Sequence, residues 1–260
     1  MSHDATQPTL PDRHESSLTE RIRRLGFVDL ATLAAFEAAR DEAAPIAPTL
    51  RLSFSLAARL RERSVLRLLE VPPRSPGYGQ ARAIYDPLAW EYLADPPELG
   101  VLRTVIHEEL CSRSQAAHGE ALWLWIALAD AELEGYVAHL LRRHQMDTGW
   151  VRAILDRAGP ELSVLSLAQK RAVTWNGVRE GAAAFLRTRG DATQCVEAVV
   201  CELRRQARWM LRHDPQALGW LPQSSWRQPI LLTTFLSRLP LGQSYWTEVP
   251  ALEALAGLNR

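Results

Sequence analysis

The chain has 260 residues, 47% of them hydrophobic and 23% charged, and its 30 basic and 30 acidic residues cancel. This composition excludes collagen, coiled-coil and largely disordered chains, and the length suits one large or two small globular domains. Because the net charge is zero, only local patches of charge can attract nucleic acid or an anionic membrane.

Cysteine usage and the N-terminal residues indicate the compartment. The three cysteines, Cys111, Cys195 and Cys201, form no even set and no CxxC pair, which argues against a disulfide framework or a zinc ribbon. A reducing cytoplasm is therefore expected. Residues 1–15 lack the apolar core of a secretion signal and are expected to be a disordered lead. Lys170 is the only lysine, an arginine bias typical of a GC-rich bacterial genome; selection for bidentate contacts is the alternative.

The first predicted elements form a small helical lobe over residues 16–71. Ser17 and Glu20 have capping-box spacing and open a short helix. A second helix is predicted over 29–44 and a third over about 53–70, after a short stretch that alternates apolar and polar residues.

A long break follows the lobe. Residues 71–85 contain three prolines and two glycines, and such a loop inside one compact domain is uncommon. We interpret it as the boundary between the lobe and a main helical body over 86–215. A functional loop is the alternative interpretation.

The main body is expected to be organised around two helices within residues 97–145, hinged at Gly119. Apolar residues recur there at steps of three and four, the spacing of an amphipathic helix. Nine consecutive apolar residues precede Asp130, which predicts a helix covered on most sides. The run is too short to cross a bilayer, so no membrane contact is expected.

Three further helices complete the predicted body. The first follows Asp147 and ends before Gly159-Pro160, the second begins at the capping box of Ser166 and Gln169, and the third ends at His213. Residues 216–260 form an irregular C-terminal extension with short helices near 230–239 and 249–258. Because no βαβ alternation occurs, the predicted fold class is all-α, a compact multi-helix bundle.

One set of residues has the chemistry of metal ligands. His107, Cys111 and His118 are spaced i, i+4 and i+11, which would bring them to one side of a single helix. However, the chain has no HExxH motif and no ExxH pair, so two surface histidines and a buried thiol explain the same residues. We expect no catalytic residue, cofactor or small-molecule substrate, and keep these three as weak metal candidates.

Charge segregates along the chain, and two arginine rows stand out. Residues 86–134 hold ten acids against two arginines, between two basic flanks. The rows, at i, i+4 and i+8, are predicted to contact nucleic acid or an acidic partner. The alternatives are that each row is a solvated helix face or that it docks on the acidic helices inside the fold. The rows consist of Arg59, Arg63 and Arg67, and of Arg204, Arg208 and Arg212 beside Trp209.

Nine tryptophans are a high count for this length. Five of them fall inside predicted helices and are expected in the core: Trp123, Trp125, Trp150, Trp175 and Trp209. Exposed tryptophans are favoured anchors at protein interfaces. Those in the looser C-terminal region, Trp220, Trp226 and Trp246, are therefore the predicted contacts for a protein partner, with packing of an irregular tail as the alternative.

These observations favour a non-enzymatic cytoplasmic adaptor or structural subunit of a bacterial multiprotein assembly. It would bind a protein partner through the Trp-rich C-terminal region and the segregated charged faces. Two alternatives stay open: a nucleic-acid-binding accessory protein that uses the arginine rows, and a metal-dependent enzyme centred on His107, Cys111 and His118.

Overall fold

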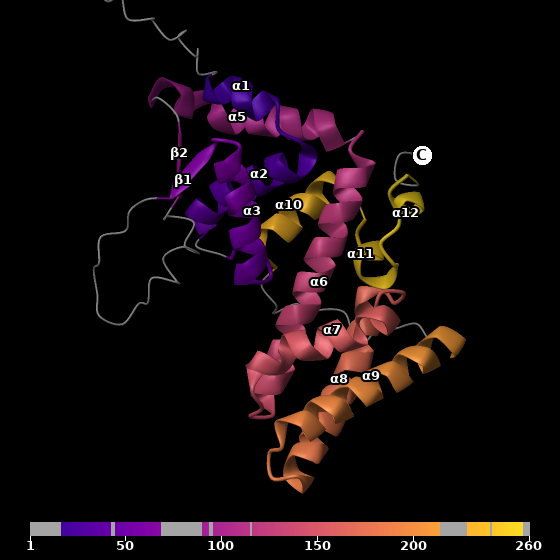
Figure 1. Cartoon of the computed structure of the whole chain (residues 1–260). Coiled ribbons are helices and arrows are strands. Elements are labelled where there is room, and N and C mark those ends of the chain that lie inside the picture. Colours follow the sequence, from indigo (N-terminus) through magenta and orange to yellow (C-terminus); the bar gives the residue numbers. More distant parts are fainter. Residues whose placement is uncertain are drawn as a thin grey trace, which may run out of the picture.

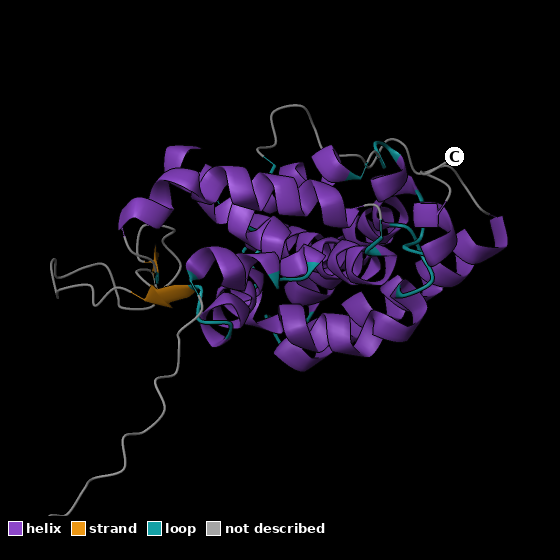
Figure 2. Cartoon of the chain, turned by 90° about the horizontal axis from the view of Figure 1, so that it is seen from above, coloured by secondary structure: helices purple, strands orange, loops and turns teal. Residues whose placement is uncertain are grey.

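The computed structural model describes residues 17–42, 45–68, 90–93, 96–114, 116–213, 228–239 and 241–256. These residues are nearly all helical (Figures 1 and 2), which confirms the all-α prediction. The helices are α1 (Leu18–Arg23), α2 (Phe27–Glu42), α3 (Leu50–Glu62), α5 (Pro96–Ser114), α6 (His118–Arg143), η2 (Thr148–Trp150), α7 (Val151–Leu162), α8 (Leu167–Arg187), α9 (Ala192–His213), α10 (Ile230–Arg238), α11 (Ser244–Thr247) and α12 (Leu252–Ala256). Two short strands, β1 (Leu66–Leu68) and β2 (Trp90–Tyr92), form an antiparallel pair.

Helix α6 runs through the middle of the molecule (Figure 1). Helices α1, α2, α3, α5 and α10 gather around its first half, and α7, α8 and α9 gather around its second half. Helices α11 and α12 lie against α8 and α6 respectively. Within the described ranges, no helix is both long and apolar enough to span a lipid bilayer.

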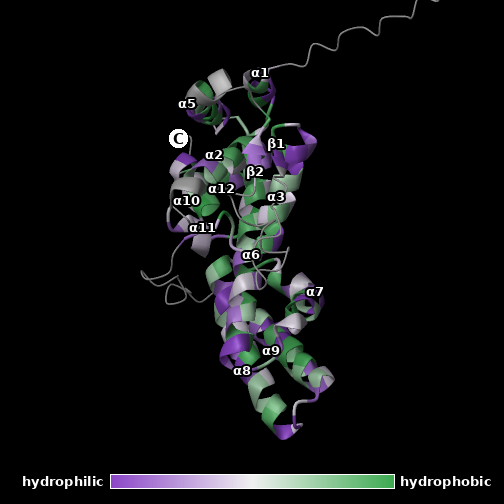
Figure 3. Ribbon diagram, turned by 90° about the vertical axis from the view of Figure 1, so that its left-hand side faces the viewer, coloured by the Kyte–Doolittle hydropathy of each residue, from purple (hydrophilic) through white to green (hydrophobic). Residues whose placement is uncertain are grey.

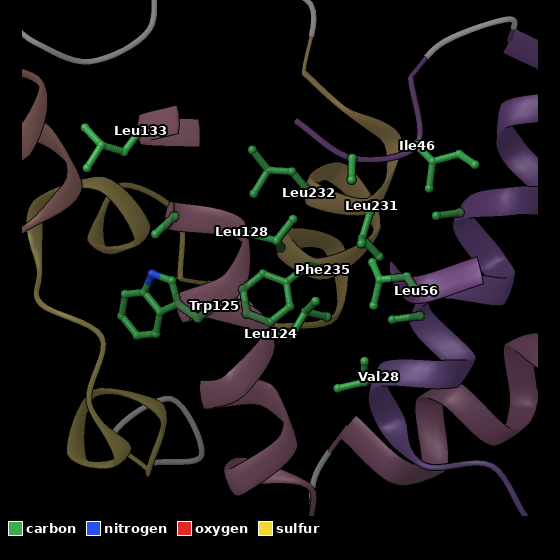
Figure 4. Close-up of a cluster of buried hydrophobic side chains, with 14 of the residues drawn as sticks. Val28, Ile46, Leu56, Leu124, Trp125, Leu128, Leu133, Leu231, Leu232 and Phe235 are labelled. Atoms are coloured by element: carbon green, nitrogen blue, oxygen red, sulfur yellow. The ribbon is translucent and has the colours of Figure 1, made fainter. Parts of the chain in front are cut away.

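The core is one contiguous cluster of apolar side chains that extends from α1 to α12. In Figure 4, Trp125 and its neighbours on α6 meet Phe235 and Leu232 of α10, with Val28 of α2 and Leu56 of α3 beyond them. The Trp125 indole Nε1 donates to the Tyr245 carbonyl oxygen at 3.3 Å. The described part of the predicted C-terminal extension therefore packs on the body.

A carboxylate of α6 caps the start of α2. The Glu120 side chain accepts a hydrogen bond from the Val28 backbone N–H at 3.0 Å, one of the N–H groups that a helix N-terminus leaves without an internal partner. A Cβ at Gly26 would lie 2.5 Å from the Glu120 carboxylate oxygens, so only glycine permits this approach. This contact links the start of α2 to the first turn of α6.

Helices α8 and α9 form a closely packed pair because glycines line their contact. A Cβ at Gly181 would meet the Val199 side chain at 2.3 Å, and one at Gly177 would meet Leu203 at 2.9 Å. The capping box of Ser166 and Gln169 is present at the start of α8, as predicted. Figure 3 shows the mixture of polar and apolar residues along both helices, most of whose apolar residues are buried.

The third helix differs from its prediction at both ends. Thr49 caps it, so α3 starts at Leu50, and it stops at Glu62 because Ser64 adopts a left-handed conformation with φ of 56°. The chain then forms β1, in which Leu66 pairs with Tyr92 and Leu68 with Trp90. The pairing joins the two sides of the predicted boundary at 71–85, which itself lies outside the described residues.

Two other predicted helix limits are wrong. Helix α7 continues through Pro160 to Leu162, because a proline late in a short helix removes only one internal hydrogen bond and its ring lies at the surface. The break between α5 and α6 comes before His118 and not at Gly119, which lies in the first turn of α6.

Candidate functional site

An arginine bridges two of the proposed metal ligands. On α5, His107 and Cys111 both face Arg238 of α10, whose guanidinium donates from Nη1 to the Cys111 Sγ at 2.9 Å and from Nη2 to the His107 Nδ1 at 2.8 Å. A guanidinium has only donors, so the His107 Nδ1 must accept and the proton of the neutral ring lies on Nε2.

The metal candidates therefore do not assemble. The Arg238 guanidinium lies where a cation between His107 and Cys111 would have to bind, and His118 belongs to a different helix. Over the described ranges, no three His, Cys, Asp or Glu side chains are arranged to hold a metal ion. The prediction from sequence spacing was wrong because it assumed that residues 107–118 form one continuous helix.

A solvent-open groove adjoins this arginine, between α2, α5 and α10. Its volume is about 220 Å³. Its lining combines four apolar residues, which we call the floor, with four polar ones, which we call the rim: Glu37, Arg103, His107 and Arg238. Glu37 accepts a hydrogen bond from the Tyr92 hydroxyl at 2.6 Å and lies 3.7 Å from Arg103. The floor is lined by Ala34, Ala38, Ile106 and Leu110.

The first predicted arginine row points partly into the fold. Arg59 and Arg63 lie 3.0 and 4.0 Å from the buried carboxylate of Asp29. Arg67 lies on β1 rather than on α3 and pairs with Glu91. The three arginines therefore do not form one helical row, and each has an acidic neighbour within the protein.

The second row lies on a single helix, α9, but two of its arginines pair with a carboxylate of α7. Arg204 and Arg208 lie 3.3 and 3.8 Å from the same carboxylate, Glu161. Arg212 donates only locally among the described residues, to the Arg208 carbonyl oxygen at 3.2 Å. Trp209 is 41% exposed, so its expected place in the core is wrong.

Of the three C-terminal tryptophans predicted to be exposed anchors, the structure describes Trp246. Trp246 is only 6% exposed and packs edge-on against Tyr245. This contradicts its predicted role as an exposed anchor, because the short helix α11 turns its aromatic residues toward α6 and α8. Trp220 and Trp226 lie outside the described residues.

Exposed apolar side chains occur instead on α6. Trp123 and Ile126 are 44% and 43% exposed, one turn apart, and Asp130 continues the same face one turn later. We call these three residues the α6 outer stripe. Arg59 of α3 lies over the Trp123 ring, 5.4 Å from its centroid. The sequence-based placement of Trp123 in the core is therefore wrong, although Trp125 is fully buried as expected.

The opposite face of α6 carries a buried polar cluster. Burial raises the pKa of Glu132 to about 8, and the neighbouring Arg171 of α8 opposes this rise only in part. The Arg171 guanidinium lies over the Tyr136 ring, 4.4 Å from its centroid. Burial also raises the pKa of Tyr245 well above its usual value, and the Glu132 and Asp130 charges add to the effect. The Glu132 Oε1 and the Tyr245 hydroxyl have no hydrogen-bond partner in the described structure.

Comparisons with known proteins add no family. The chain matches no protein-family model, no curated protein and no solved structure. Function is therefore inferred from the geometry above.

Proposed function

We propose that the protein is a non-enzymatic adaptor or structural subunit that docks a partner protein on the α6 outer stripe. One observation supports this proposal above all. Trp123 and Ile126 are more than two-fifths exposed although they lie on the central helix, whereas the other apolar residues of α6 are largely covered. A Trp and an Ile one turn apart provide the aromatic and aliphatic anchors typical of interface hot spots.

The surroundings of the stripe indicate the chemistry of the partner. From residue 118 to residue 141, α6 contains no lysine or arginine, whereas Asp130 and Glu134 carry negative charge along its outer side. Neighbouring elements supply the pairing cations, with Arg51 bound to Glu134 and Lys170 3.7 Å from Asp130. Because these cations already pair with the two carboxylates and Arg59 lies over Trp123, the unmatched feature of this surface is apolar, and a partner helix with a row of apolar residues complements it.

We further propose that the protein is located in the cytoplasm. Its three cysteines are free, and Cys201 is exposed, so a reducing compartment suits the chain. We also propose a bacterial origin, which the arginine-rich composition favours.

A matched pair of variants tests the docking face. Ile126→Glu places a charge in the stripe, and Leu186→Glu places the same charge on an 81% exposed residue at the end of α8. We expect a partner that purifies in fixed stoichiometry with the wild type and with Leu186→Glu, and is lost with Ile126→Glu. Circular dichroism confirms that both variants fold. A partner retained by Ile126→Glu, or a lone monomer from cells at native expression, contradicts the proposal.

Nucleic-acid binding at the end of α9 is the second candidate. After Glu202, the helix carries four arginines and no acid, beside the exposed Trp209. This combination suits phosphate contact with base stacking. If it holds, changing Arg204, Arg208 and Arg212 together to Gln abolishes a binding that weakens steeply with salt. If single-stranded DNA and RNA fail to bind the wild type even in low salt, the candidate is eliminated.

A further inference from the structure

The groove between α2, α5 and α10 contains an arginine, Arg238, that is held by hydrogen bonds but has no carboxylate partner among the described residues. Both terminal nitrogens of Arg238 donate to uncharged acceptors, the His107 imidazole and the Cys111 sulfur. No described carboxylate lies within ion-pair distance of Arg238, whereas the groove's other arginine, Arg103, has Glu37 at 3.7 Å. The Arg238 guanidinium is thus fixed in direction while its positive charge stays available.

The hydrogen bonding of this guanidinium is also incomplete. Its Nε is buried and has no acceptor among the described residues. A buried donor without a partner costs stability, and such groups call for an explanation, often a functional one. The terminal nitrogens each keep a second N–H, and Arg238 and His107 both line the groove.

The remaining lining sets the size and polarity of a ligand. Four apolar side chains form the floor, and the volume of about 220 Å³ falls below the usual range for drug-sized ligands. A cavity of roughly 150 Å³ holds a benzene ring, so this groove accepts a ring or a branched alkyl group with a small polar head.

We infer that this groove binds a small carboxylate bearing an aromatic ring or a branched alkyl group, with the carboxylate on Arg238 and the apolar part on the floor. The His107 Nε2–H is a second donor at the rim. This site is separate from the α6 outer stripe. Failure of the ligand-binding test would therefore not count against the proposed function, and failure of the docking test would not count against this site.

Titrations with benzoate and benzamide test the charge requirement. Both probes have the same ring, but only benzoate is charged. We expect benzoate to cause saturable shifts in the NMR signals of His107, Ile106 and Leu110, and benzamide to bind at least about tenfold more weakly, the value of one charge-assisted hydrogen bond. Equal affinity of the two probes, or shifts that avoid these residues, overturns the inference.

Three variants locate the site. Arg238→Gln removes the charge and should weaken benzoate binding about tenfold or more, whereas Arg152→Gln, an exposed arginine on α7, should leave it unchanged. Ala38→Leu adds bulk to the floor and keeps the Arg238 charge, so it should also abolish binding and keeps the inference testable if Arg238→Gln misfolds. Benzoate binding that survives both Arg238→Gln and Ala38→Leu overturns the inference.

Discussion

Trp123 and Trp125 are two residues apart on α6 and meet opposite environments. The Trp125 ring is fully buried and stacks on Tyr245 with centroids 6.2 Å apart, whereas the Trp123 ring is 44% exposed beneath Arg59. The acidic residues repeat the contrast, since Asp130 faces solvent and Glu132 is buried. The inner face of α6 thus holds the fold together, whereas the outer face leaves Trp123 and Ile126 partly exposed to solvent.

The largest expected difference is between two tryptophan truncations. Trp125→Ala removes a buried ring and should lower the free energy of unfolding by about 3–5 kcal/mol. Trp123→Ala loses mainly the contact with Arg59 and should cost less than about 1 kcal/mol. Urea denaturation of both variants gives the comparison, and similar losses would mean that the two faces are not distinct.

Glu132→Gln should change how stability depends on pH. The unfolded carboxyl loses its proton above its ordinary pKa of 4.5, whereas the folded one keeps it to about 8, so folding takes up a proton between these values. Wild-type stability therefore falls as pH rises from 4.5 to 8. The variant lacks this loss and should be more stable than the wild type by up to about 4 kcal/mol at pH 8, with little difference near pH 4.5.

The control for this pH effect is Glu134→Gln, on the outer side of α6. Its carboxylate bonds to an exposed arginine, Arg51, and no comparable gain at pH 8 is expected. Denaturation curves across the pH range measure both variants. If Glu132→Gln parallels the wild type at every pH, the carboxyl of Glu132 is not protonated in the fold.

Asp130→Asn tests the ion pair between the outer side of α6 and Lys170 of α8. Burial lowers the pKa of Lys170, and the exposed Asp130 carboxylate opposes that change. Removing the carboxylate leaves a largely buried ammonium without its ion-pair partner, at a cost of about 1–2 kcal/mol. Asp156→Asn, in an exposed pair with Arg152, should cost less than about 0.5 kcal/mol. Equal costs measured by thermal unfolding would contradict this difference.

The smallest effect is expected for Tyr245→Phe. The buried hydroxyl has no hydrogen-bond partner in the described structure, so its removal should leave stability within about 0.5 kcal/mol or raise it by about 1 kcal/mol. Tyr92→Phe, which loses the bond to Glu37, should instead cost about 1 kcal/mol. A marked loss in Tyr245→Phe would show that the hydroxyl bonds to an internal water.

Local signals allowed much of the helical framework to be predicted. The Ser166 capping box and the long apolar period of α6 depend on residues within a few positions of one another, and both appear in the structure. The β1–β2 pair could not be predicted, because its strands are separated by 21 residues and each is only three residues long.

The candidate surfaces were harder to predict for a related reason. Nine consecutive apolar residues give α6 no polar face in sequence, so the pattern could not show that Trp123 and Ile126 face solvent. Arg238 lies 127 positions from Cys111, and no local motif links them. These contacts depend on how whole helices pack.

The most direct test of partner docking is site-specific photo-crosslinking inside cells. A photoreactive phenylalanine replaces Trp123 in one strain and the similarly exposed Trp209 in another. We predict one discrete adduct from position 123, identified by mass spectrometry as a single protein with an apolar segment at the crosslink, and no such adduct from position 209. No adduct at position 123, or the same adducts from both positions, would contradict docking on the α6 outer stripe.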